Sequence, residues 1–419
     1  MKKLLQINSV VNIGSTGRIV EEIGQLAIQN DWESYIAYGR MNGVSKSILV
    51  KIGTELDIRF HGLQTRLFDN HGLGSKKATI KLIEQIIKIG PDIIHIHNLH
   101  GYYLNIKLLF EQLTSVSIPV VWTFHDCWPI TGHCAYFDFA GCERWKTECY
   151  NCPQKNVYPA SFGFDHSKQN YHLKKELFTS LQNSTLVPVS NWLNGIIKKS
   201  FLKQLSFQVI NNGINTDVFQ PNHNPFIRNK YKLNDKLIIL GVASTWSIRK
   251  GLKDFIELRS KLDSDFQIIL VGLDEDQIKL LPDKIIGISK TESVQELALY
   301  YSSADIFVNP TWEDNFPTTN LEALACGTPV ITYNTGGSPE AINEDTGFIV
   351  EKGDIQGLIH AINFIKDRGK RSYSAACRER AEKLYDKNDR YMDYIKIYES
   401  ILIKQGTHCS IEQTQYHKV

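Results

Sequence analysis

The stretch NPTWEDNFPTTNLEALACGTPV, from Asn309 to Val330, carries most of the information about the fold. An apolar strand, 305–309, runs into an acidic loop, and we expect a helix to begin near 317–319 and to end at Gly327. Proline near the first turn and glycine just past the last turn are typical of helix boundaries. The free backbone N–H groups at the start of such a helix favour a phosphate group. The segment therefore predicts a strand–loop–helix unit with a ligand site at the carboxyl end of the strand.

The same strand-and-helix pattern repeats along the rest of the chain. Short apolar runs alternate with helical periodicity, which predicts βαβ units and mostly parallel sheets. We expect strands at Leu4–Ile7, Ile93–Ile96, Val120–Phe124, Leu186–Val189, Leu237–Val242, Gln267–Val271, Ile285–Ile288, Asp305–Asn309, Val330–Thr332 and Phe348–Val350. A chain of 419 residues is too long for one comfortable core, so two successive Rossmann-like domains are predicted.

The predicted domains are 1–206 and 207–385. The first contains a cysteine-rich insertion at 127–153, which has no counterpart in the second. The remainder, 386–419, is predicted as a helix that packs back on the first domain, followed by a tail.

Composition and charge exclude several classes of protein. Apolar residues make up 42% and charged residues 22% of the chain, which is normal for a globular protein. A formal net charge of +2 predicts no nucleic-acid partner. No apolar run is long enough for a transmembrane helix, and Gln6 and Asn8 interrupt the apolar start, which we interpret as a first strand instead of a signal peptide. We therefore expect a cytoplasmic protein.

The segment quoted above resembles the E-x7-E region of the retaining glycosyltransferases of family 4. Asp314 and Glu322 occupy its two acidic positions, and LEALACGTPVI matches the usual continuation. The family normally has glutamate first, whereas this chain has the shorter aspartate, preceded by Glu313. The resemblance implies an α/β fold of the GT-B type, with two facing Rossmann-like domains and an interdomain cleft. It makes 1–206 the acceptor-side domain and 207–385 the nucleotide-sugar donor domain.

The resemblance also implies roles for these residues. Asp314 would position the donor sugar for catalysis, and Glu322 would hold the ribose. The donor nucleotide would in addition contact Phe316, Pro317, Thr318 and Thr319.

Two further loops match the family in the expected order. The run from Gly14 to Gly17 resembles its N-terminal glycine loop, where glycine lets backbone approach the donor diphosphate. Lys250 matches the lysine that neutralises the departing diphosphate. The family arginine lies several residues earlier, where this chain has 244–246, and Arg249 is the candidate replacement.

Histidines follow two of the predicted strands of the first domain. His125 resembles the family histidine that faces the donor sugar, and we assign it a catalytic role. His95 and His97 alternate along a strand, so we expect at most one of them to face the ligand. We place His95 in the core and His97 in the cleft lining.

The cysteine-rich insertion resembles one found in colanic-acid and exopolysaccharide-type members of the family. A Cys-x2-Cys pair with two earlier cysteines can close a tetrahedral zinc site, and reduced thiols or disulfides are the alternatives. The candidate ligands of a structural zinc ion are Cys134, Cys142, Cys149 and Cys152.

These features predict a retaining glycosyltransferase that moves a sugar from a nucleotide-diphosphate donor to a saccharide acceptor, which can be lipid-linked, in surface polysaccharide biosynthesis. The resemblance implies front-face displacement without a metal cofactor. Alternatives are a sugar-nucleotide epimerase of the same fold, a non-catalytic nucleotide-sugar-binding protein and, last, a dehydrogenase, since no G-x-G-x-x-G follows the first strand. The basic, apolar stretch 195–203 predicts peripheral contact with the inner face of the cell membrane.

Overall fold

The computed structural model describes residues 1–416, and their side chains as far as Lys404. The chain divides into two compact units. Unit 1 consists of Met1–Ile210 and the segment from Asn388 onward, and unit 2 consists of Asn211–Lys387. These boundaries lie a few residues beyond the predicted ones at 206/207 and 385/386. The last residues of the predicted C-terminal tail, 417–419, lie outside the described part of the chain.

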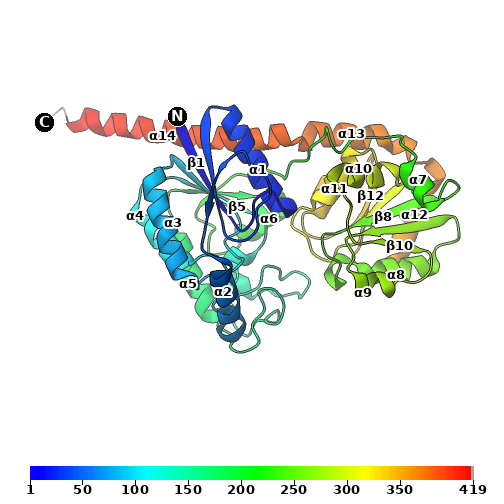
Figure 1. Ribbon diagram of the computed structural model, residues 1–419, viewed down its shortest axis with the longest axis horizontal. Coiled ribbons are helices and arrows are strands. Elements are labelled where there is room, and N and C mark those ends of the chain that lie inside the picture. The colour runs from blue at the N-terminus through cyan, green and yellow to red at the C-terminus, as the bar shows by residue number, and fades with distance from the viewer. Residues whose placement is uncertain (417–419) are drawn as a thin grey trace. The chain divides into compact units, whose positions relative to one another are not determined.

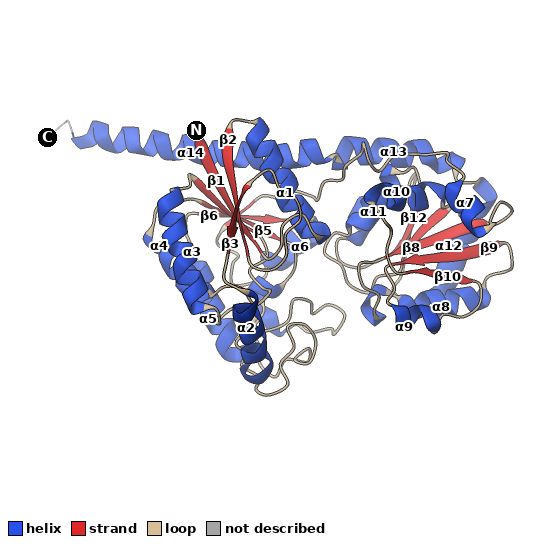
Figure 2. Ribbon diagram, in the orientation of Figure 1, coloured by secondary structure: helices blue, strands red, loops and turns tan. Residues whose placement is uncertain are grey.

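Unit 1 contains a parallel sheet in the order β3-β2-β1-β4-β5-β6-β7 (Figure 1). The strands are β1 (Lys2–Asn8), β2 (Trp32–Tyr38), β3 (Ile48–Lys51), β4 (Ile93–Ile96), β5 (Val120–Phe124), β6 (Ser184–Pro188) and β7 (Ser206–Phe207). The helices are α1 (Gly14–Gln29), α2 (Glu55–Phe68), α3 (Lys76–Ile89), α4 (Ile106–Ser115), α5 (Ser167–Thr179) and α6 (Asn191–Ile197). Helices lie on both sides of this sheet (Figure 2), which buries both of its faces.

Unit 2 repeats the arrangement, with a parallel sheet in the order β10-β9-β8-β11-β12-β13. The strands are β8 (Leu237–Val242), β9 (Phe266–Val271), β10 (Ile285–Ile288), β11 (Ile306–Asn309), β12 (Val330–Tyr333) and β13 (Gly347–Val350). The helices are α7 (Phe226–Tyr231), α8 (Leu252–Lys261), α9 (Glu275–Lys279), α10 (Val294–Ser303), α11 (Thr318–Ala325), α12 (Ile355–Arg368) and α13 (Arg371–Tyr385).

The last helix, α14 (Lys387–Tyr416), belongs to the core of unit 1 over its described side chains. Tyr391, Tyr394 and Tyr398 are buried in the same apolar cluster as Leu4 and Ile23. The hydroxyl of Tyr398 lies 2.6 Å from Nδ1 of His95, so the chain returns to unit 1 through specific contacts as well as apolar burial.

All ten strands expected from the sequence are present, and the α/β prediction is confirmed. Three strands were missed, β2, β3 and β7. The run WESYIAY of β2 interleaves polar residues with apolar ones, and β3 and β7 are short strands at the sheet edges, so none shows the continuous apolar run of a central parallel strand. The run from Gly14 to Gly17, predicted as a glycine loop, instead forms the first turn of α1, which begins at Gly14.

None of the helices in the described residues is both long enough and apolar enough to cross a bilayer.

Candidate functional site

The order of the strands in the sheet of unit 2 reverses between β8 and β11. From β8 the chain proceeds outward to β9 on one side, and from β11 it proceeds outward to β12 on the other. In open α/β sheets the ligand binds beyond the carboxyl ends of the strands at such a switch point. Two loops leave the sheet here, 243–251 after β8 and 310–317 after β11. These loops carry Lys250 and Asp314, so the two residues predicted to flank the donor lie at the position that topology favours.

Lys250 and Asp314 contact each other directly. The ammonium group of Lys250 forms an ion pair with the carboxylate of Asp314, and both side chains remain about one-fifth exposed, at 22% and 19%. Arg249 donates from its guanidinium to the carbonyl oxygen of Glu313 at 2.7 Å. The backbone N–H of Trp312 returns a bond to the carbonyl of Arg249 at 2.8 Å, so the two loops are bound to each other.

Two glycines make the close approach of these loops feasible. Gly251 has φ +81°, and a Cβ atom there would lie 2.2 Å from the carbonyl oxygen of Pro310. Gly336 has φ +54°, and its Cβ would lie 1.8 Å from the carbonyl oxygen of Asp314. Since that carbonyl also accepts a hydrogen bond from Gly337 N–H at 3.1 Å, the glycine-rich turn after β12 fixes the backbone of Asp314.

Helix α11 begins at Thr318, directly after the Asp314 loop. Pro317 is its N-cap residue, and because proline has no side-chain acceptor it makes no capping hydrogen bond to the first N–H groups. Thr318 and Thr319 are half-buried, whereas Phe316 is buried and its carbonyl accepts a hydrogen bond from Asn212 at 3.1 Å. The predicted helix start is confirmed, and a phosphate group at this helix end stays a prediction.

Glu322 lies inside α11 and is buried, with 3% of its surface exposed. Its Oε2 accepts a hydrogen bond from the Tyr301 hydroxyl at 2.7 Å. This contact could not be read from the sequence, since Tyr301 belongs to a different helix, α10. The carboxylate is therefore held inside unit 2, and its predicted contact with ribose is untested.

In unit 1, the predicted catalytic histidine follows β5 and belongs to a hydrogen-bonded chain. Nε2 of His125 lies 3.1 Å from Nδ1 of His97, and Nε2 of His97 lies 3.2 Å from Oε1 of Gln6. The amide of Gln6 is oriented by its donation to the carbonyl of Val20, so Oε1 accepts a hydrogen bond from Nε2–H of His97. His97 Nδ1 is then an acceptor, and His125 donates to it through Nε2.

Burial keeps His125 neutral. Burial lowers the pKa of His125 to about 4, against a smaller opposing effect of Asp126. Burial also lowers the pKa of His97 well below its usual value. A neutral His125 that donates through Nε2 has Nδ1 as its hydrogen-bond acceptor.

The expectation that alternation along the strand separates His95 from His97 is wrong. The two rings lie on the same side, with centroids 3.9 Å apart, because residues two apart in a strand share one face. Both are buried, and His95 is fixed between Thr123 and Tyr398. His95 is a core residue, as predicted, while His97 positions His125 from below the surface.

A second pair in unit 1 was not singled out in the sequence. Nε2 of His100 lies 2.5 Å from the carboxylate of Asp126, and Nδ1 of His100 lies 2.9 Å from the Tyr158 hydroxyl. Burial alone would raise the pKa of Asp126, but His100 and the Trp128 N–H together outweigh it and lower that pKa. The His-Asp dipeptide at 125–126 after a strand was the available signal for this pair.

Gly17, the predicted contact to the donor diphosphate, lies in the first turns of α1. It is buried, and a Cβ atom there would lie 3.1 Å from the backbone nitrogen of Asn12. Its carbonyl accepts a hydrogen bond from the same nitrogen at 2.9 Å. The glycine is thus explained by packing against 10–12, and its donor contact stays a prediction.

The four candidate zinc ligands line one small cavity of about 10 Å³ in the insertion of unit 1. Their thiols are free, and a hydrogen bond from Cys134 lowers the pKa of Cys152 to about 7. In the described residues, however, no group of three or more His, Cys, Asp or Glu side chains is arranged to hold a metal ion. The four cysteines share a cavity, but as placed they do not surround a point at which a zinc ion could be bound. The zinc site therefore stays a prediction.

Comparison with known proteins identifies a family domain in unit 2. Residues 223–384, nearly all of unit 2, match the family described as Glycosyl transferases group 1. A protein of Escherichia coli (strain K12) named as a colanic acid biosynthesis glycosyl transferase, WcaC, is 25% identical over 384 residues, which cover 85% of this chain and 89% of WcaC.

Solved structures share the fold across both units. Sucrose-phosphate synthase from Thermosynechococcus elongatus matches with a TM-score of 0.72 and 17% identity, over 96% of this chain and 100% of the other. Anabaena HepE, solved in complex with UDP-glucose, matches with a TM-score of 0.66 and 14% identity over the same shares. The fold is therefore GT-B, and the chain is a glycosyltransferase that carries a glycosyl transferases group 1 domain at residues 223–384.

Proposed function

We propose that this glycosyltransferase moves a sugar, with retention at the anomeric carbon, from a nucleotide-diphosphate donor to a saccharide acceptor in surface polysaccharide biosynthesis. The observation that carries the proposal is the Lys250–Asp314 ion pair, which lies at the switch point of unit 2 next to the uncapped start of α11. The names of WcaC and of the HepE complex with UDP-glucose support polysaccharide chemistry and a nucleotide-sugar donor.

Binding of the donor would separate this ion pair. A diphosphate carries more negative charge than Asp314 and would take Lys250 as its counter-ion, with Arg249 beside it. Asp314 would then be released to accept hydrogen bonds from sugar hydroxyls. The first N–H groups of α11 would bind the phosphate oxygens, so the diphosphate could be neutralised without a divalent cation.

The chemical step would then be a front-face displacement. The glycosidic C–O bond to the β-phosphate breaks, and the electron pair leaves with the nucleoside diphosphate. The acceptor hydroxyl attacks the same face of the anomeric carbon, and the departing phosphate oxygen takes its proton. Lys250 stabilises the charge that develops on the leaving group, which is where preorganised cations contribute most. Neutral His125 would accept a hydrogen bond from a hydroxyl of the donor sugar.

The acceptor would be a lipid-linked saccharide reached from the cytoplasm, at the inner face of the cell membrane. This part rests on the kinship with WcaC and on the chemistry of polysaccharide assembly, in which acceptors are often lipid-linked. The structure does not favour the predicted membrane stretch 195–203, because Ile197 and Leu202 are fully buried there and the lysines alone are exposed.

Product analysis tests the proposal. The enzyme is incubated with each candidate nucleotide sugar, with and without a saccharide acceptor, and the products are examined by NMR. We expect a new glycoside of the donor's anomeric configuration, formed equally well in EDTA. Inversion at the anomeric carbon would refute the mechanism, and conversion of the donor sugar without any acceptor would identify an epimerase.

A further inference from the structure

Helix α2 in unit 1 turns an apolar stripe to the solvent. Leu56, Phe60, Leu63 and Leu67 are spaced by four, three and four residues, so they lie along one side of the helix. Their exposed fractions are 75%, 64%, 50% and 46%. The buried side of α2 is formed by His61, Gly62 and Thr65 instead, which reverses the usual orientation of an amphipathic helix.

The segment that follows the cysteine-rich region extends this stripe. The ring of Phe164 stacks on Phe68 at the end of α2, with centroids 6.0 Å apart. The N–H of Phe162 donates to the carbonyl of Arg66 at 2.8 Å. Phe162 and Phe164 are themselves 66% and 58% exposed, so two aromatic rings continue the surface beyond the helix.

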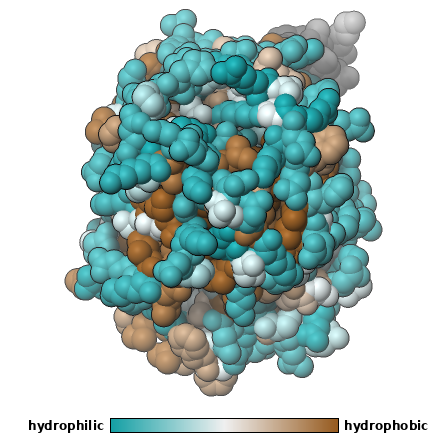
Figure 3. Space-filling model, turned by 90° about the vertical axis from the view of Figure 1, so that its right-hand side faces the viewer, coloured by the Kyte–Doolittle hydropathy of each residue, from teal (hydrophilic) through white to brown (hydrophobic). Residues whose placement is uncertain are grey.

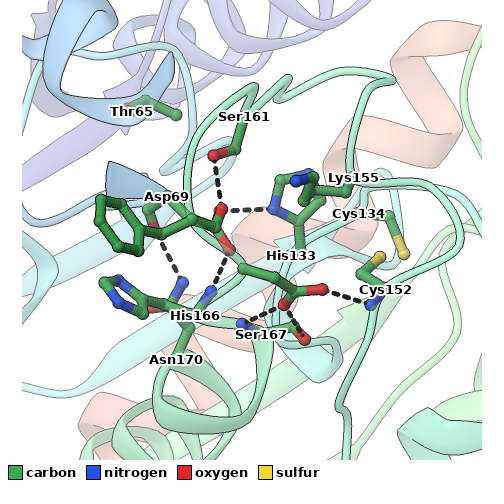
Figure 4. Close-up of polar contacts among 12 residues, drawn as sticks. Thr65, Asp69, His133, Cys134, Cys152, Lys155, Ser161, His166, Ser167 and Asn170 are labelled. Atoms are coloured by element: carbon green, nitrogen blue, oxygen red, sulfur yellow. Dashed lines mark hydrogen bonds and ion pairs between the residues drawn. The ribbon is translucent and has the colours of Figure 1, made fainter. Parts of the chain in front are cut away.

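A buried polar network fastens this segment to α2. Asp69 ends the helix in a left-handed conformation, and its carboxylate lies 2.5 Å from Nδ1 of His133 and accepts from the backbone of His166 at 2.8 Å (Figure 4). The carbonyl of Asp69 accepts from Asn170 at 2.8 Å. The side chains of Asp69 and His133 are fully buried. The segment that carries the exposed rings of Phe162 and Phe164 is therefore held to α2 by buried hydrogen bonds.

The charges beside the stripe are basic. Arg59 and Arg66 are seven residues apart, which places them on the same margin of the helix, and both are exposed. Within the described side chains, neither forms an ion pair. The acidic residues of α2 lie in its first turn, where Asp57 is bound to Thr54 and Glu55 lies 3.7 Å from Lys51. The margin therefore offers two positive charges that form no ion pair within the described side chains.

We infer that α2 and residues 162–164 form a docking surface for a membrane that contains anionic lipid. A helix with leucine and phenylalanine on one face and arginine on its margin suits the lipid interface, because the apolar side chains enter the acyl boundary while the arginines meet the headgroups. Figure 3 shows hydrophobic side chains gathered along the lower margin of one face of the molecule. The inference rests on the proposed function only for the lipid-linked acceptor that would lie at such a surface.

Vesicle binding tests this surface without any donor or acceptor. Full-length protein is sedimented with vesicles of phosphatidylcholine alone and with vesicles that also contain phosphatidylglycerol, at low and high salt. We expect binding to the anionic vesicles, weakened by salt. The double variant Phe60→Gln/Leu63→Gln should lower the partition coefficient by about tenfold or more, and Arg59→Gln/Arg66→Gln should lower it by about threefold or more.

The matched control is Leu280→Gln, which changes an 82% exposed leucine in unit 2. It should bind vesicles as the wild type does, and all variants should keep the wild-type melting temperature. The inference is overturned if Phe60→Gln/Leu63→Gln binds like the wild type, or if that change converts a dimer into a monomer in the absence of vesicles. Nucleotide binding by the wild-type protein is measured in parallel. If the wild-type protein binds no nucleotide, the proposed function is refuted, whereas the docking surface is not.

Discussion

Replacing Lys250 with methionine tests the central electrostatic step of the proposed reaction. Methionine preserves much of the apolar stem and removes the positive charge. In the free enzyme the change breaks the ion pair with Asp314, whose two side chains are about one-fifth exposed. Ion pairs with this degree of exposure contribute about 1 kcal/mol or less to stability, so we expect the variant to fold with a slightly lower melting temperature.

The expected effect on catalysis is larger than the effect on stability. Two opposite unit charges about 4 Å apart interact by about 4 kcal/mol at an effective dielectric constant of about 20. Giving up the contact with Asp314 costs about 1 kcal/mol of this, which leaves about 3 kcal/mol for the charge that develops on the leaving diphosphate. At about 1.4 kcal/mol per factor of ten, kcat/KM should fall by about two orders of magnitude.

A continuous assay of nucleoside diphosphate release measures this loss. The assay uses the donor and acceptor identified by product analysis. The control is Lys253→Met, which removes an exposed lysine three positions further along the chain, on α8. The control should keep kcat/KM within about twofold of the wild type, as expected for an exposed charge that water and salt screen. A folded Lys250→Met enzyme with kcat/KM close to that of the wild type would refute the assignment of Lys250.

Other expectations follow from the same geometry. Glu322→Ala should lower kcat/KM by about two orders of magnitude if its carboxylate holds the ribose, and a loss of stability alone would limit it to a structural role. Gly336→Ala should disrupt donor binding in a titration, because its Cβ would meet the carbonyl of Asp314, while Gly369→Ala, also at positive φ but with open space around it, should only lower the melting temperature slightly. Burial lowers the pKa of His61 and His125 to about 4, so thermal unfolding should show full stability above pH 6.5 and a loss of up to about 1.4 kcal/mol per pH unit for each histidine as the pH falls toward 4; a flat profile would contradict this.

The sequence predicted the parts of the site that depend on local pattern. Asn309 to Gly327 contains a strand end, a loop, a proline and a terminal glycine in order, and the structure has β11 and α11 where this pattern placed them. Lys250 could be placed in a loop after a strand for the same reason. Parallel strands bring their carboxyl ends to one edge, so loops distant in the sequence converge without any information about side chains.

What the sequence could not give depends on contacts between distant segments. The hydrogen bond to Glu322 comes from Tyr301 on a neighbouring helix, and the tautomer of His125 is set by Gln6 on β1 and His97 after β4. The sequence also did not show which face of α2 points to solvent. Its apolar stripe has the spacing of an ordinary core-facing helix, and only the folded chain shows that the stripe points to solvent.

Binding of nucleotides to the purified protein tests the account most directly. Thermal unfolding is followed with UDP, GDP, ADP and CMP, each with and without EDTA, because a ligand that binds only the folded chain raises its melting temperature by mass action. We expect one nucleoside diphosphate to raise the melting temperature, EDTA to leave that rise unchanged, and Lys250→Met to abolish most of it. If no nucleotide changes the melting temperature, or if the rise requires a divalent cation, the proposed metal-independent donor site in unit 2 is wrong.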